Sequence, residues 1–211
     1  MKKVFLVLVL FGIVLSTNAQ DDTKEKQKEK NKKKGGFKKE NLFLGGNVTA
    51  SFFSGGTLLG LSPYFGYSLN KYVDLAASVN YNYTSQRDYI DYGDKVRQTV
   101  FGPGALVRLF PVHFLFAQAQ YEHNFIRLKY IPASGSIYAP SITHIDANSV
   151  LVGGGYTSGR RDGNNTFYYL SIMWDVAGVA ESPYVDGLGR SIPVIRAGYN
   201  IGLFQGRHSR R

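Results

Sequence analysis

The fold of this chain is decided by stretches such as residues 73–84, which read VDLAASVNYNYT. The odd positions of this stretch carry Val, Leu, Ala, Val, Tyr and Tyr, whereas the even positions carry Asp, Ala, Ser, Asn, Asn and Thr. Because successive side chains of a β-strand point to opposite faces, the stretch predicts a strand with one apolar and one mainly polar face.

The same alternation recurs along the rest of the chain. It is found in residues 42–52, 57–69, 97–109, 113–127, 148–157, 166–177 and 192–204. Each of these stretches is long enough to cross a bilayer when tilted, which takes about 9–11 residues. The sequence therefore predicts an all-β protein with eight antiparallel strands.

The composition of the two faces favours a membrane protein. The polar face is mostly Gly, Ser, Asn and Gln, which suits a narrow barrel interior, whereas a face in bulk water would carry more Lys and Glu. The apolar face carries aromatic residues near strand ends, as aromatic girdles do. These are Tyr67, Tyr81, Tyr83, Tyr121, Phe125, Tyr168, Trp174 and Tyr199. We therefore expect an up-and-down transmembrane β-barrel, with a soluble lipocalin-like ligand carrier as the alternative.

The connections between the predicted strands alternate in length. Those near Asn70-Lys71, Pro111-Val112 and 158–165 are compact. The longer ones cover about 85–96, 128–147 and 178–191, and the first hairpin, 53–56, departs from the pattern by being short. Short turns on one side and long loops on the other are typical of outer-membrane barrels, with both termini in the periplasm.

The N-terminal residues have a different character. Residues 1–19 show the layout of a secretory signal peptide, with Lys2 and Lys3 before an apolar run and small residues before the expected cleavage site. Residues 20–40 are rich in Lys and lack aliphatic side chains, so we expect a disordered periplasmic linker.

The charge of the chain lies mostly outside the predicted barrel. The net charge is +10, yet residues 41–204, the predicted barrel, hold 11 basic and 10 acidic residues. The excess belongs to the N-terminal segments and to a basic C-terminal tail, 205–211, which we also place in the periplasm. This distribution argues against a nucleic-acid partner.

The predicted second hairpin carries a family resemblance. The stretch SPYFGYSL, residues 62–69, runs through Asn70-Lys71 into VDLA, residues 73–76. It resembles the outer-membrane β-barrel domain family, which includes the small OmpA- and OmpX-type barrels of the porin-like superfamily. The resemblance implies an eight-stranded barrel in the outer membrane of a gram-negative bacterium, with membrane lipid, lipopolysaccharide and the barrel assembly machinery as partners. The chain departs from the family in continuing past Phe204, since members often end on such an aromatic residue.

Charged residues on the predicted inward face form the candidate site, a lumen charge network. They are Asp74, Arg108, Glu122, Asp175 and Arg196. We expect Asp74 to pair with Arg108 on adjacent strands and Asp175 with Arg196, whereas Glu122 has no evident mate. Buried charges need partners. The network would either close the lumen or line a narrow, gated pore.

Enzymatic chemistry is a weaker prediction. His123 is expected on the lipid side near the outer end of its strand, where a lipid A-modifying enzyme would hold a catalytic histidine, but no Ser stands at the matching spacing. His144 and Asp146 are expected in the longest loop, with Ser141 and Ser149 nearby. The chain has no Cys, its four His are far apart, and no phosphate-binding loop is present, so we predict no catalytic residue, metal or cofactor.

The predicted long loops are rich in Tyr and Ile. They hold Tyr89, Tyr92, Tyr130, Ile131, Tyr138, Ile142 and Tyr184. Such loops either bind a surface ligand or pack on one another as a lid. The sequence thus predicts a non-enzymatic outer-membrane protein with a structural or surface-interaction role.

Overall fold

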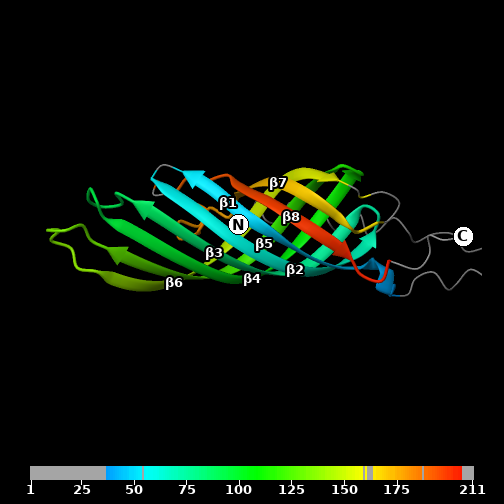
Figure 1. The fold of residues 1–211 in the computed structure, drawn as a ribbon, viewed down its shortest axis with the longest axis horizontal. Helices are drawn as coiled ribbons and strands as arrows, with labels where there is room; N and C mark the ends of the chain where they lie inside the picture. The colour runs from blue at the N-terminus through cyan, green and yellow to red at the C-terminus, as the bar shows by residue number, and fades with distance from the viewer. Residues whose placement is uncertain (1–36, 54, 159, 161–163, 187, 206–211) are drawn as a thin grey trace, which may run out of the picture. The chain divides into compact units, whose positions relative to one another are not determined.

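The computed structural model describes residues 37–53, 55–158, 160, 164–186 and 188–205, and these fold into a closed barrel (Figure 1). Its strands are β1 (Leu42–Phe53), β2 (Gly56–Asn70), β3 (Val73–Arg87), β4 (Lys95–Val112), β5 (Leu115–Ile131), β6 (Ser141–Ser158), β7 (Phe167–Asp175) and β8 (Val194–Gly202). A short 3-10 turn, η1 (Lys39–Asn41), precedes β1. The predicted signal peptide, residues 20–36 of the predicted linker and residues 206–211 of the tail lie outside the described residues.

Each strand pairs with its sequence neighbours in antiparallel register, and β1 closes the ring by pairing with β8. The closing register runs from Phe43 opposite Gly202 to Ala50 opposite Ile195. The predicted eight-stranded antiparallel barrel is therefore confirmed.

The outer face of the barrel is apolar, whereas the interior combines many buried polar side chains with three apolar clusters. Outward side chains such as Val48, Leu61 and Leu170 are 57%, 56% and 55% exposed, whereas inward Asn80 and Glu122 are 0% exposed. A soluble barrel has the reverse polarity, with an apolar interior and a wet outer face. The soluble ligand-carrier alternative is therefore wrong.

No helix among the described residues is long and apolar enough to span a membrane.

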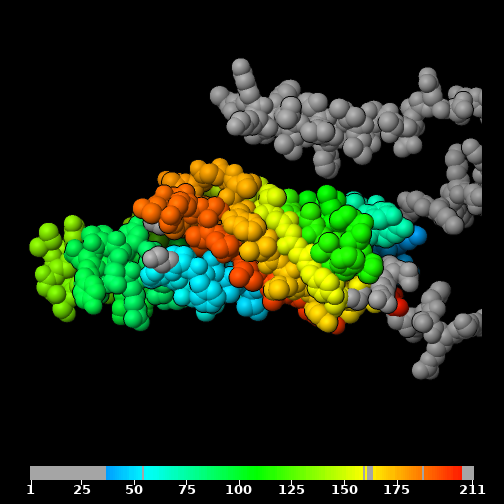
Figure 2. All heavy atoms as spheres, turned by 90° about the horizontal axis from the view of Figure 1, so that it is seen from above, coloured from blue at the N-terminus to red at the C-terminus, as the bar shows by residue number. Residues whose placement is uncertain are grey.

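We call the end of the barrel that holds the long connections the loop end. At this end, the strands on one side of the barrel extend farther than those on the other side. Strands β4 and β6 have 18 residues each, whereas β7 and β8 have nine each. We call the loop ends of β3 to β6 the raised wall; it comprises residues 83–87, 95–100, 126–131 and 141–147. Figure 2 shows it projecting at the left, in teal and green, past the cyan and orange parts of the chain.

The strands of the raised wall extend into a region that the sequence predicts to be a loop. The predicted loop 128–147 is mostly strand, because Tyr130 pairs with Ser141 and the β5–β6 ladder continues inward from there. Polar residues at alternate outward positions conceal these strand ends in the sequence, since they break the apolar pattern. The longest connection is instead 176–193, between β7 and β8.

Candidate functional site

The end of the barrel that holds the chain termini is filled by a cluster of apolar side chains, which we call the aromatic plate. Its members are Phe43, Tyr64, Ala76, Leu106, Phe110, Phe116, Phe167 and Tyr169, all buried. Its ring pairs are edge to face or tilted, and the Phe116 and Tyr169 centroids are 5.7 Å apart at 89°. Glycine makes room for the rings, since a Cβ at Gly45 or Gly198 would overlap the ring of Tyr64 or Tyr169.

Arg108 is buried against the aromatic plate. Its guanidinium carbon lies 4.2 Å from the ring centroid of Tyr169 and 4.9 Å from that of Tyr64. Its Nε donates to Gln118 Oε1 at 2.7 Å. Stacking on two aromatic faces away from water favours the cation.

The predicted ion pair between Asp74 and Arg108 is wrong, although the two residues are directly opposite on β3 and β4. Asp74 is instead held by Arg160, with Nη1–Oδ2 at 2.6 Å and Nη2–Oδ1 at 2.9 Å. Ser68 Oγ also donates to Asp74 Oδ1, at 2.6 Å. The two-pronged geometry suits a planar guanidinium, whereas Arg108 is turned toward the rings.

Arg160 is a site residue that sequence reasoning missed. It lies in the connection between β6 and β7, yet it is 5% exposed and its guanidinium carbon lies 3.8 Å from the Phe110 ring centroid. The prediction considered only strand faces and therefore ignored turn residues. The available signal was an arginine in the compact turn between β6 and β7, at the same end of the barrel as Asp74.

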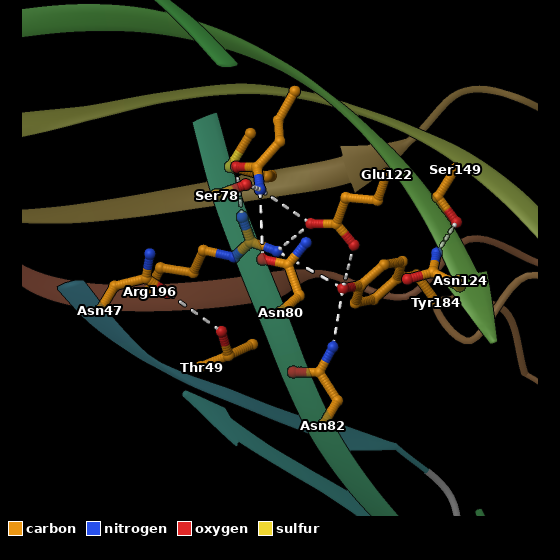
Figure 3. A network of polar contacts seen from close by, with 12 residues as sticks. Asn47, Thr49, Ser78, Asn80, Asn82, Glu122, Asn124, Ser149, Tyr184 and Arg196 are labelled. Atoms are coloured by element: carbon orange, nitrogen blue, oxygen red, sulfur yellow. Dashed lines mark hydrogen bonds and ion pairs between the residues drawn. The ribbon is translucent and has the colours of Figure 1, made fainter. Parts of the chain in front are cut away.

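The middle of the barrel is occupied by a hydrogen-bonded network around Glu122 and Arg196, both 0% exposed (Figure 3). Arg196 Nη2 donates to Glu122 Oε1 at 2.9 Å, and Arg196 Nη1 donates to Gln120 Oε1 at 2.6 Å. Gln120 also donates to Glu122, at 2.9 Å. Through Gln118, which donates to Gln120 at 2.9 Å, the network continues to Arg108.

The predicted pairing of Arg196 with Asp175 is therefore wrong as well. Arg196 stands opposite Ser171 in the β7–β8 ladder, and its side chain reaches across the lumen to β5. Glu122, expected to lack a mate, is its ion-pair partner. In a narrow barrel the nearest charge is often across the interior and not on the adjacent strand, which strand-by-strand reasoning does not reveal.

The β7–β8 connection enters the barrel from the loop end. Tyr184 is 0% exposed, and its hydroxyl donates to Glu122 Oε2 at 2.6 Å and accepts from Asn82 Nδ2 at 2.9 Å. Asp175 holds the base of this loop, because it accepts from the backbone N–H groups of Val150 and Ala177 at 3.0 and 2.9 Å and from the Ser182 hydroxyl.

The predicted loop tyrosines thus lie in different environments. Tyr184 packs inside the barrel, where it contacts a buried cluster of Leu58, Leu151, Met173 and Val194. Tyr92, in the β3–β4 connection, is 94% exposed. Of the predicted loop tyrosines, Tyr130 and Tyr138 pack on one another, with ring centroids 6.5 Å apart. Tyr184 instead packs among strand residues, and Tyr92 lies free of such contacts with the described residues.

Above the network lies a pocket of about 510 Å³ at the mouth, between the raised wall and the β7–β8 connection. Its lining combines tyrosine, aliphatic, amide, hydroxyl and carboxylate side chains. They belong to Thr84, Gln86, Tyr89, Ile90, Val96, Gln98, Ile126, Leu128, Tyr130, Tyr138, Ala139, Ser141, Thr143, Ile145, Ala180, Glu181, Ser182, Val185 and Asp186. Thr84 is 6% exposed, and its hydroxyl has no hydrogen-bond partner among the described residues.

The β3–β4 connection, which supplies Tyr89 and Ile90 to the pocket, is organised by Asp94. The carboxylate accepts the backbone N–H groups of Tyr89, Ile90 and Asp91 at 2.6, 2.8 and 2.9 Å. Burial acts to raise the pKa of Asp94, but these N–H donors outweigh it and lower the pKa below its usual value of 3.8.

Two histidines that the sequence singled out, His123 and His144, lie on strands β5 and β6. His123 Nδ1 lies 2.8 Å from Asn148 Oδ1, which also accepts from the Tyr121 hydroxyl at 2.8 Å. His144 stands on β6 opposite Arg127, so its predicted loop position is wrong. Within the described part of the chain, no group of three or more His, Cys, Asp or Glu could hold a metal ion.

The apolar outer face and the polar, hydrogen-bonded interior together decide the class of protein. The fold is that of a membrane-spanning β-barrel. No protein-family profile matches the sequence, and no curated protein matches it.

Several solved outer-membrane proteins are similar to this chain in structure. The attachment invasion locus protein Ail of Yersinia pestis is 10% identical, with a TM-score of 0.44 over 76% of this chain and 96% of that chain. The N-terminal barrel of OprF from Pseudomonas aeruginosa is 16% identical, with a TM-score of 0.42 over 77% and 98%. Neisserial surface protein A is 14% identical, with a TM-score of 0.38 over 76% and 95%.

Proposed function

We propose that this protein is a small, non-conducting barrel of the outer membrane that binds a ligand at its mouth. The observation that carries the proposal is the position of the pocket. Thr84, which lines it, follows Asn82 on the inward face of β3, and Asn82 belongs to the network with Tyr184 and Glu122. The pocket therefore opens at the loop end and has the filled interior as its floor.

The filled interior supports the absence of conduction. Among the described residues, three carboxylates and three guanidinium groups are buried inside, and each has a partner in the structure: Asp74, Glu122, Asp175, Arg108, Arg160 and Arg196. An ion that crossed would have to separate these partners in a low-dielectric interior. We accordingly favour a closed lumen over a narrow pore.

The orientation follows from the pattern of connections. The long connections and the pocket are at one end and the termini at the other, so we place the pocket outside the cell and the termini in the periplasm. The predicted signal peptide supports export to that compartment.

The chemistry of the pocket favours a glycan as ligand. Tyr89, Tyr130 and Tyr138 offer aromatic faces, and the amides and hydroxyls offer hydrogen bonds. The volume of about 510 Å³ falls in the range of small-molecule sites. The carboxylate of Glu181 repels anions, whereas that of Asp186 is paired with Arg190, so we infer an uncharged or amino sugar.

A glycan array probed with the detergent-purified protein tests this function. We expect binding to a subset of neutral or amino-sugar glycans that Tyr89→Ala reduces at least tenfold. Tyr92→Ala is the matched control, since Tyr92 lies in the same connection but does not line the pocket. Equal binding by the two variants, or no glycan bound at all, would contradict the proposal.

We further propose that the barrel is not an enzyme. The His123 ring contacts the Asn148 side chain, and among the described residues no hydrogen bond joins it to the Ser or Thr hydroxyl that a nucleophile would require. Unchanged lipid A from expressing cells, measured by mass spectrometry, is the expected result. A deacylated or newly acylated lipid A that disappears in His123→Ala would contradict it.

A further inference from the structure

The outer face of the raised wall carries a cluster of basic residues, which we call the basic outer patch. It consists of Arg87 on β3, Lys95 and Arg97 on β4, and Arg127 and Lys129 on β5. Strand alternation puts these residues on the same face as outward Tyr83, Phe101 and Phe125. Lys95 is half-buried and the other four are exposed.

The register of the strands sets like charges opposite one another. Arg87 pairs with Lys95, and Arg97 pairs with Lys129, in the antiparallel ladders. Side chains directly opposite in such ladders have Cβ atoms about 4.5–5.5 Å apart, and like charges at that spacing destabilise the sheet. Arg127 in turn stands opposite His144.

Acidic residues do little to offset these cations. None of the five makes an ion pair with a described residue. Asp146 is a diagonal neighbour of Arg127 across β5 and β6. The carboxylates of the β3–β4 connection are occupied within the loops, since Asp88 and Asp94 accept backbone N–H groups and Asp91 accepts from Ser136. The five cations of the basic outer patch therefore have one carboxylate beside them, that of Asp146, and the patch keeps a net positive charge.

The position of the patch indicates what the anion is. The patch begins directly beyond Tyr83, Phe101 and Phe125, outward aromatic residues that are 39%, 50% and 46% exposed. Aromatic residues of this kind sit at the headgroup level of a membrane. The other side of the barrel presents apolar outward residues at its loop end, among them Phe52, Trp174 and Ile195. The cations are thus confined to one side, at the height of lipid headgroups.

We propose that the basic outer patch is a binding site for the phosphate groups of lipopolysaccharide in the outer leaflet. Arginine and lysine side chains are suited to phosphate, and a multivalent anion relieves the repulsion between the opposed cations. The site is separate from the mouth pocket, because it lies on the opposite face of the same wall. It rests on the proposed outer-membrane location, not on the glycan proposal.

Native mass spectrometry of the detergent-solubilised protein tests the site with three probes, namely bis-phosphorylated lipid A, dephosphorylated lipid A and inorganic pyrophosphate. We expect the phosphorylated lipid to bind and the other two to bind at least tenfold more weakly. The double variant Arg97→Gln/Lys129→Gln should lose at least tenfold in lipid affinity. Lys71→Gln, which removes a cation from the β2–β3 turn at the opposite end of the barrel, should keep it.

Equal losses in the double variant and in Lys71→Gln would overturn the site. Equal binding of the dephosphorylated lipid would overturn the role of phosphate, and equally tight binding of pyrophosphate would overturn the assignment to lipid. Tyr89→Ala separates this proposal from the glycan proposal, since it should leave lipid binding unchanged. A band that shifts on boiling in a gel of the outer-membrane fraction checks the location independently.

A second readout distinguishes a binding site from a merely structural patch. Without lipid, the double variant should unfold at a higher temperature than the unmodified protein, because it lacks the opposed charges. With phosphorylated lipid A present, the order should reverse. A variant that is less stable than the unmodified protein in both conditions would contradict the proposal.

Discussion

The two ends of the barrel interior are built differently. The end with the chain termini is packed by the aromatic plate and by two arginines stacked on its rings. The loop end is formed by a connection, residues 176–193, that is tied to the wall by Asp175 and Tyr184 and leaves a pocket above it. Strand residues thus fix one end, whereas a loop fills the other, and the loop end has the room and the polar variety that a ligand site needs.

The test with the largest expected effect compares two buried aspartates, Asp74 and Asp175. Asp74→Asn removes the carboxylate from the two-pronged pair with Arg160 at the packed end and leaves a buried cation. We expect it to cost about 3–5 kcal/mol of unfolding free energy. Urea unfolding in detergent, followed by the mobility of the folded band, measures the change.

Asp175→Asn is the matched change at the loop end. Asp175 accepts N–H and hydroxyl groups and has no cationic partner among the described residues, so we expect a smaller loss of about 1–3 kcal/mol. Protease sensitivity of 176–193 should rise more than global unfolding. Equal destabilisation by the two variants would break the comparison between the ends.

Arg108→Ala probes the packed end without creating an unpaired carboxylate. The change removes three guanidinium–ring contacts, with Tyr64, Phe116 and Tyr169, and leaves a cavity between Tyr64 and Tyr169. We expect a loss of about 3 kcal/mol, read from the same urea transition. Arg108→Met, which keeps most of the volume, should recover part of it. An unchanged midpoint for Arg108→Ala would show that the aromatic plate holds without the cation.

Tyr184→Phe probes the attachment of the loop. The change deletes the hydroxyl between Glu122 and Asn82 while the ring stays in its apolar cluster. We expect a loss of about 1–2 kcal/mol of unfolding free energy, with faster amide exchange confined to 176–193. Tyr92→Phe is the control, since that side chain is 94% exposed. Exchange that spreads over all strands would mean that the loop supports the barrel as well as the mouth.

The smallest expected effect is that of acidic pH on the stability of the β3–β4 connection. Because the folded Asp94 has a lowered pKa, its contribution to loop stability is fully present above about pH 4 and is lost as pH falls through the folded pKa. Proteolysis of 88–94 by an acid-active protease should therefore accelerate toward low pH. Asp94→Asn should abolish that pH dependence, and an identical pH profile in both proteins would contradict the role of Asp94.

The sequence predicts the barrel well because strand alternation is a local signal. Asp74 and Glu122 are assigned to the inward face by period two alone, and both are 0% exposed. Their partners are not predictable in this way, because Arg160 arrives from a turn and Arg196 reaches across the lumen. Tyr184 illustrates the same limit, since a loop residue carries no periodic signal that would show it entering the barrel.

The length of the strands in the raised wall is a further feature that the sequence pattern does not predict. Residues 141–147 look like a loop because His144 and Asp146 interrupt the outward apolar pattern, yet register with β5 continues through them. Above the membrane a strand has no lipid-facing side, so alternation of polarity no longer marks it.

The most direct test of the closed, membrane-spanning barrel is single-channel recording of the purified, refolded protein in a planar lipid bilayer. The account predicts insertion, verified by protease protection of the strands, without resolvable current steps. Deletion of the buried part of the loop, residues 182–184, should leave the current at baseline or nearly so, because the aromatic plate and the Glu122–Arg196 pair remain. Stable current steps from the unmodified protein would contradict the account.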